Sequence, residues 1–295
     1  MNSTAYLAPF YGLASAFLFA LSNHFNNRAL ETCDARAGTL ISIGTAAIVY
    51  WLFAPFFLVG WYWVTTAALM FAIVGIIRPV LSTTLAINSI KVMGPTLTSS
   101  LTATTPIFGA VFAILILRES LTLPIAIGTL AVVAGAVVAA WNPKGLKRTW
   151  PLWAIALPLG AALIRATGHI VTKYGLIEVP SPSFAVLVGN TVSLGTALAA
   201  YGWERRPIAV GGSAYTGQLW FVASGVVIAL SVQFLNNALA IGDVVAVLPI
   251  VSATPVFTLL MGFFWFGREI ITWRTIATMA LIVPGVILVA VSGAK

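Results

Sequence analysis

The stretch Thr105-Pro106-Ile107-Phe108 recurs 149 residues later as Thr254-Pro255-Val256-Phe257. Just downstream, Arg118-Glu119-Ser120-Leu121-Thr122 recurs as Arg268-Glu269-Ile270-Ile271-Thr272 at an offset of 150. Order and spacing are kept over most of each half of the 295 residues. Such self-similarity at one long period indicates two copies of a single structural unit. We assign the copies to residues 1–141 and 152–295, with a connecting loop at 142–151.

The composition places both copies in a membrane. Hydrophobic residues make up 60% of the chain and charged residues 7%, whereas a soluble domain carries roughly a quarter of its residues as charged ones. Unbroken apolar runs predict helices rather than a barrel, and the first run lacks the basic start of a cleavable signal peptide. Turn signals and charges delimit ten spans, at roughly 6–30, 37–59, 62–90, 94–117, 122–141, 152–177, 181–202, 215–241, 243–266 and 272–292.

Five crossings per copy force the second copy to enter the membrane upside down relative to the first. The expected fold class is an all-α membrane protein with ten transmembrane helices, arranged as two inverted five-helix repeats around a central cavity. This architecture provides two related conformations, each open to one side, as alternating access requires. Ten crossings put both termini on one side, and the excess of Lys and Arg in the odd-numbered loops predicts that this side is extracytoplasmic.

The repeated motifs resemble a known family. The doubled Thr-Pro and Arg-Glu stretches, with Gly128 and Gly135 in the first copy and Gly285 in the second, look like the EamA-type exporters of the drug/metabolite transporter superfamily. Thr278 stands where the second copy would carry its first glycine. The resemblance implies ten helices and export of small metabolites, with amino acids, including aromatic ones, among them. It also implies cytoplasmic termini, in disagreement with the charge count.

Two arginines are expected near the bilayer centre. Arg78 lies deep in the third span and Arg165 deep in the sixth, where an ionisable side chain costs several kcal/mol and is usually functional. The repeat places an apolar residue opposite each of them, which suits the binding of an asymmetric molecule. We predict that both attract substrate; the alternative is that each caps carbonyls freed by a neighbouring proline, Pro79 or Pro158.

The acidic residues are all predicted at or beside loops. There are seven of them, and none is expected at the midplane, so the embedded carboxylate with which small multidrug-resistance relatives exchange cations has no counterpart. Arginines without counter-carboxylates favour a ligand that carries its own carboxylate or another anionic group.

Two histidines, His24 and His169, occupy matching repeat positions. Histidine titrates near neutral pH, so these residues are candidates for gating or proton relay, with ordinary packing as the alternative. Each is followed four residues later by a basic residue, Arg28 or Lys173, which fits an interfacial snorkelling pair.

Neutral polar residues and prolines complete the candidate site. Interhelical hydrogen bonding is the alternative role for the polar ones, and the prolines are expected to kink their helices or act as hinges. The predicted substrate contacts are Ser82, Asn88, Asn237, Thr105 and Thr254, and the predicted kinks are Pro79, Pro106 and Pro255.

Together these features predict an alternating-access exporter of small carboxylate-bearing metabolites, apolar or aromatic amino acids first, in the inner (plasma) membrane. A transporter of phosphorylated or nucleotide-linked metabolites stays open as an alternative, although two arginines are few for phosphates. An intramembrane enzyme would need a nucleophile–base pair or paired carboxylates at depth. No phosphate-binding, zinc or nucleophile-elbow motif occurs, so we expect no enzymatic activity, cofactor or metal. The expected partners are a small molecule and the bilayer, not nucleic acid, and the expected state is a monomer or homodimer.

Overall fold

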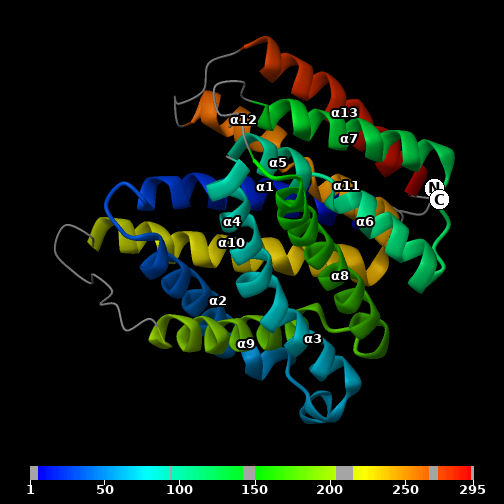
Figure 1. Cartoon of the computed structure of the whole chain (residues 1–295). Helices are drawn as coiled ribbons and strands as arrows, with labels where there is room; N and C mark the ends of the chain where they lie inside the picture. Colours follow the sequence, from blue (N-terminus) through cyan, green and yellow to red (C-terminus); the bar gives the residue numbers. More distant parts are fainter. Residues whose placement is uncertain (1–5, 94, 142–149, 204–214, 266–271, 294–295) are drawn as a thin grey trace.

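The computed structural model describes residues 6–93, 95–141, 150–203, 215–265 and 272–293, and these residues form helices without any strand (Figure 1). The connecting loop from 142 and the Arg268-Glu269 motif lie outside the described residues. The helices group into ten crossings, and two of these, the fourth and ninth, are bent. In chain order they are α1 (Leu7–Ala29), α2 (Ala35–Phe57), α3–η3–α4 (Thr66–Ile76, Ile77–Ser82, Thr83–Met93), α5–α6–η4 (Pro95–Thr102, Thr105–Phe112, Ala113–Leu117), α7 (Leu123–Ala140), α8 (Ala156–Glu178), α9 (Pro182–Trp203), α10 (Tyr215–Ile241), α11–α12 (Val244–Val251, Thr254–Phe264) and α13 (Trp273–Gly293).

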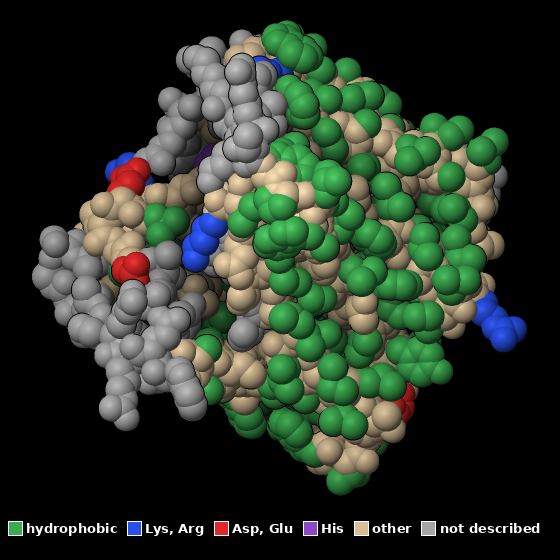
Figure 2. Space-filling model, viewed as in Figure 1, with side chains coloured by type: hydrophobic (Ala, Val, Ile, Leu, Met, Phe, Trp, Pro, Cys, Tyr) green, Lys and Arg blue, Asp and Glu red, His purple; other side chains and the backbone are tan. Residues whose placement is uncertain are grey.

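Length and composition explain why these helices suit a bilayer. Eight described segments are long and apolar enough to cross a membrane, and α1 and the interrupted third crossing complete the ten. Ile48, Leu52 and Phe56 form an exposed stripe along one face of α2, as expected for a surface in contact with lipid. Figure 2 shows hydrophobic side chains over most of the visible face and charged ones gathered toward its two ends. The predicted all-α, ten-helix membrane fold is confirmed.

The contact between α7 and α13 reveals the inversion of the repeats. A Cβ atom on Gly128 would lie 2.6 Å from the carbonyl oxygen of Gly285, and one on Gly135 would lie 3.2 Å from that of Thr278. Equivalent positions of the two copies therefore meet in opposite order, which requires the helices to run antiparallel. The contact is close because glycine has no side chain, as the spacing of Gly128 and Gly135 predicts.

Serine pairs hold another antiparallel contact, between α1 and α10, which lie side by side in Figure 1. The hydroxyl oxygens of Ser15 and Ser231 are 3.3 Å apart, and those of Ser22 and Ser224 are 2.8 Å apart. The repeat maps this contact onto the one between the third crossing and α8, where the hydroxyl of Ser82 donates to a backbone carbonyl of α8. The two copies are therefore interleaved rather than placed side by side.

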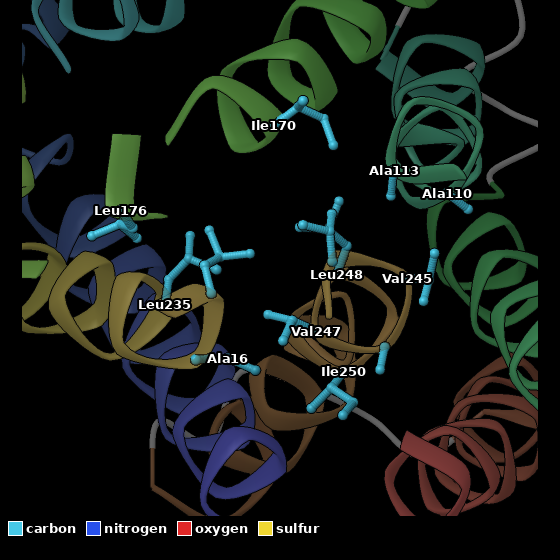
Figure 3. Close-up of a cluster of buried hydrophobic side chains, with 14 of the residues drawn as sticks. Ala16, Ala110, Ala113, Ile170, Leu176, Leu235, Val245, Val247, Leu248 and Ile250 are labelled. Atoms are coloured by element: carbon cyan, nitrogen blue, oxygen red, sulfur yellow. The ribbon is translucent and has the colours of Figure 1, made fainter. Parts of the chain in front are cut away.

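The main hydrophobic cluster draws side chains from both repeats (Figure 3). Most of its members lie in the half of their helices nearer the end of the bundle where α1 begins and α13 ends, which we call the terminal side. Every residue of α11 from Val244 to Ile250 is buried. The cluster therefore fills the terminal half of the bundle interior with apolar side chains. The labelled members are Ala16, Ala110, Ala113, Ile170, Leu176, Leu235, Val245, Val247, Leu248 and Ile250.

Candidate substrate-binding site

The two predicted arginines lie together at the contact between the third crossing and α8. Arg78 belongs to η3 and Arg165 to α8. A Cβ atom on Gly168 would lie 2.7 Å from Cδ of Arg78, so the stem of Arg78 lies on α8 at this glycine. Nε of Arg165 donates a hydrogen bond of 3.0 Å to Oγ of Ser82, at the end of η3. Each arginine thus contacts the other's helix, and their positive charges act on one another.

A π-helical turn positions Arg78. Proline has no N–H to donate and its ring disrupts a regular helix, and position 79 falls within η3, whose turns are wider than those of an α-helix. Such π turns occur often at functional sites. The side chain of Pro79 lies outside what the structure describes. Among the described residues Arg78 has no hydrogen bond to a carbonyl, and Arg165 bonds to Ser82, so the contacts do not favour carbonyl capping for either arginine.

His169 completes the group one helical turn beyond Arg165. It is 8% exposed, its Nδ1 has no hydrogen-bond partner among the described residues, and both arginines act on it electrostatically. His24 has a different environment: its Nε2 lies 3.0 Å from the carbonyl oxygen of Thr258, which joins α1 to α12 toward the other end of the bundle. Matching repeat positions therefore have unlike surroundings. We call Arg78, Ser82, Arg165 and His169 the basic cluster.

The remaining polar candidates lie in separate places. Asn88 is exposed on α4. On α10, Nε2 of Gln233 donates to Oδ1 of Asn237 at 3.1 Å, and Oε1 of Gln233 accepts from the hydroxyl of Tyr50 at 2.8 Å. No contact of the described residues joins either asparagine to the basic cluster. Tyr50 was not predicted, because a single tyrosine within an apolar run carries no distinguishing sequence signal.

The doubled Thr-Pro motif bends two crossings at matching places, before α6 and before α12. Each proline lacks the N–H that would bond to the carbonyl four residues earlier. The preceding threonine supplies the missing donor: the hydroxyl of Thr105 donates to the carbonyl of Thr102 at 2.7 Å, and that of Thr254 to the carbonyl of Val251 at 2.8 Å. Only the oxygen lone pairs of these hydroxyls stay available to a ligand.

The sequence matches a known protein family. The sequence profile of the EamA-like transporter family matches residues 7–141 and again residues 152–291. The chain belongs to the EamA-like transporter family. It is therefore a multi-pass membrane transporter of small molecules, and the resemblance seen in the sequence is confirmed. A solved structure titled only "Crystal structure of protein" has a TM-score of 0.76 and covers 99% of this chain and 98% of its own, at 16% sequence identity. This likeness supports the fold alone. No curated protein matches the sequence.

In this EamA-like transporter a second polar contact closes the terminal side. The carboxylate of Glu119, in the loop before α7, accepts two hydrogen bonds of 3.0 Å from the N–H groups of Val244 and Val245 at the start of α11. Nζ of Lys173 donates to the carbonyls of Leu239 and Gly242, at 2.7 and 3.0 Å. We call these contacts the terminal latch. It ties a loop of the first repeat and α8 to the turn between α10 and α11.

The environment of Glu119 opposes its ionisation. Burial raises the pKa of its carboxyl above the ordinary value, and the two backbone hydrogen bonds offset part of this effect. Glu119 lies near a helix end, as its place in the sequence predicts, but the sequence alone gives it no role. Its repetition in the doubled motif was the available signal, although the partners of the carboxylate could not be read from it.

Proposed function

We propose that this EamA-like transporter exports small carboxylate-bearing metabolites by alternating access, across the inner (plasma) membrane and without enzymatic activity. The observation that carries the proposal is the basic cluster. Two guanidinium groups lie together in the middle of the bundle, and among the described residues their hydrogen bonding is limited to Ser82. A carboxylate can accept paired hydrogen bonds from a guanidinium, so a ligand bearing one would compensate the charge that the protein leaves.

Exposure and burial support a conformation closed at the terminal side. There the apolar cluster and the terminal latch fill the space between the repeats. In the opposite half of the bundle Asn23, Thr84 and Asn88 are exposed. Polar side chains at membrane depth generally face water or protein rather than lipid, which supports a central cavity open toward that half. With the predicted orientation, this conformation would take up substrate from the cytoplasm.

The mirrored bends support a rocking transition. In the opposite conformation the terminal side would open, and the half that contains His24 would close. The contact between His24 and Thr258 already joins α1 to α12 in that half, so His24 is a candidate gate through the movement of these two helices together, while the position of His169 suits contact with substrate or a proton. In this proposal Asn88, Asn237, Thr105 and Thr254 line the path, with Pro106 and Pro255 at the hinges.

The proposal extends to the chemical class of the substrate. Apolar or aromatic amino acids are the first members to test, because the sequence resemblance names amino acids. Phosphorylated or nucleotide-linked metabolites are less well supported, since the cluster offers two arginines and a histidine for several phosphate charges. An intramembrane enzyme finds less support still, because His169 has no acidic partner among the described residues to form a nucleophile–base pair. The orientation of the termini and the monomeric or dimeric state stay predictions.

Counterflow in proteoliposomes tests the function. Vesicles containing purified protein and an unlabelled amino acid should accumulate the labelled compound, which neither a passive channel nor an enzyme would do. A hydrogen bond between a charged protein donor and a ligand contributes about 1.5–3 kcal/mol to binding. Arg78→Ala and Arg165→Ala, which each remove such a donor, should therefore each reduce kcat/KM by about tenfold or more. The control is Arg274→Ala, since that side chain bonds to the carbonyl of Trp141 at the surface. Unchanged transport by both cluster variants would refute the anion site.

A further inference from the structure

If the proposed transport function holds, the numbers of hydrogen-bond donors and acceptors in the basic cluster indicate which carboxylates it binds. Among the described residues the cluster is rich in donors and has no negatively charged acceptor. Arg78 has no hydrogen-bond partner among the described residues, Arg165 bonds only to Ser82, and Nδ1 of His169 is buried and unpaired. The proton of Ser82 is directed to the carbonyl of Ala161, so the side-chain acceptors of the group are the Ser82 oxygen and one ring nitrogen of neutral His169, both without negative charge.

No described acidic residue acts on this cluster. The five acidic residues that the structure describes, Glu31, Asp34, Glu119, Glu178 and Asp243, lie at the ends of the crossings or in the loops between them. Both carboxylate oxygens of Glu119 are engaged at α11, and Glu178 accepts a bond from the N–H of Thr66 at the end of α8. A ligand bound at the cluster would have to bring the compensating charge itself.

An amino acid meets this requirement poorly. Its carboxylate would suit the guanidinium groups, but its ammonium carries an equal positive charge on the adjacent carbon. That ammonium has three donors, for which the cluster offers two neutral acceptors, the oxygen of Ser82 and a ring nitrogen of His169, and no carboxylate. Like charges at such short range repel, and an unpaired buried donor is unfavourable. The zwitterion would therefore leave the cluster with the same excess of positive charge as before.

The corresponding 2-oxo acid fits the same groups without this conflict. Its head has three acceptor oxygens, two from the carboxylate and one from the keto group, and no donor. The two guanidinium groups can meet these oxygens, and His169 adds a donor once its ring turns Nδ1, which is buried in this conformation, toward the ligand. Ile170 follows His169 on α8 and belongs to the apolar cluster, so the hydrophobic interior begins one residue beyond the basic cluster along α8.

We propose that the basic cluster selects carboxylates without an ammonium group, and that 2-oxo acids with apolar side chains are carried in preference to the matching amino acids. Arg78 and Arg165 act as specificity-determining residues through the sign of their charge, and His169 supplies one further hydrogen bond from its unpaired Nδ1. The preference is a property of the head group, so it should appear with any apolar side chain.

Matched substrate pairs test the proposal in the same proteoliposomes. Phenylpyruvate is compared with phenylalanine, and 4-methyl-2-oxopentanoate with leucine, so that only the head group differs. The wild-type protein should exchange each oxo acid with a kcat/KM at least about tenfold higher than its amino acid, which corresponds to about 1.4 kcal/mol. Arg78→Gln should reduce that ratio about fivefold or more, and Arg78→Glu, which supplies a carboxylate for the ammonium, should shift it further toward the amino acid.

The possible results distinguish a failure of the oxo-acid preference from a failure of carboxylate transport itself. Equal or faster exchange of the amino acids by the wild-type protein would overturn the preference and leave the transport proposal standing. If neither member of either pair exchanges, the carboxylate-transport proposal fails and the inference fails with it. Should Arg78→Glu not fold, as judged by gel filtration in detergent, Arg78→Gln alone decides: an unchanged ratio contradicts a role for charge.

Discussion

Replacing Glu119 with glutamine should open the terminal side of the protein. The two carboxylate oxygens each accept one backbone N–H of α11, at 3.0 Å. Glutamine has one acceptor oxygen, and its NH₂ group cannot accept, so one buried N–H loses its partner at a cost of about 1–3 kcal/mol. Burial also disfavours the charged form of Glu119, which offsets part of this loss. A net effect of about 1–2 kcal/mol changes the ratio of closed to open molecules by roughly 5- to 30-fold.

Cysteine accessibility measures that ratio. Cys33 is the single cysteine of the chain and is first replaced by Ala. A reporter, Ala113→Cys, is then introduced at a fully buried position of the apolar cluster on the terminal side. Labelling by a membrane-impermeant maleimide is followed in right-side-out and inside-out vesicles, which distinguishes the two mouths. The labelling rate from the terminal side should rise by the same factor in the Glu119→Gln background.

A matched carboxylate provides the control. Glu178 lies at the same end of the bundle, but it is exposed, and one of its oxygens accepts a single bond from the N–H of Thr66. Because glutamine can still accept that bond, Glu178→Gln should alter the labelling rate by less than about twofold. The latch does not hold the terminal side closed if Glu119→Gln is labelled no faster than its parent, or if the control variant is labelled as fast as Glu119→Gln.

Three further outcomes are expected. Since burial in the closed state raises the pKa of Glu119, the closed state binds a proton more readily than an open state in which this group is hydrated. Acidification should therefore favour closure, and raising the pH through the closed-state pKa should speed labelling of the reporter cysteine. The rate is normalised to that of an exposed cysteine, and Glu119→Gln should show no such pH dependence. Gly128→Val would place a Cβ atom 2.6 Å from a carbonyl oxygen of α13; it should destabilise the protein by about 1–3 kcal/mol and lower the Tm in detergent, whereas Gly195→Ala, which meets nothing within 4 Å, should not. Thr254→Val leaves the carbonyl of Val251 without its donor and should lower the Tm through a loss of about 1–3 kcal/mol, while Thr254→Ser, which keeps the hydroxyl, should preserve it.

The sequence by itself determined the membrane location, the number of crossings and the inverted repeat. These properties follow from the lengths of apolar runs and from the order of motifs such as Thr105-Pro106 and Thr254-Pro255, which are local features of the chain. An odd number of crossings per copy then requires inversion whatever the packing. The depth of Arg78 and Arg165 followed in the same way, because position along a spanning helix fixes depth.

Only the tertiary structure decided which of these residues share a site. The sequence did not indicate that Arg78 and Arg165 lie together with His169, that His24 is bonded to α12 instead, or that Glu119 closes the turn before α11. Each of these contacts joins helices far apart in the chain, and the helices are apolar around most of their circumference, so periodicity does not reveal which face meets which neighbour. That choice depends on close packing, for example where Gly168 leaves room for the stem of Arg78. The physical reason is that burial and pairing between distant segments are properties of the assembled bundle, whereas length, hydropathy and repetition are properties of the chain.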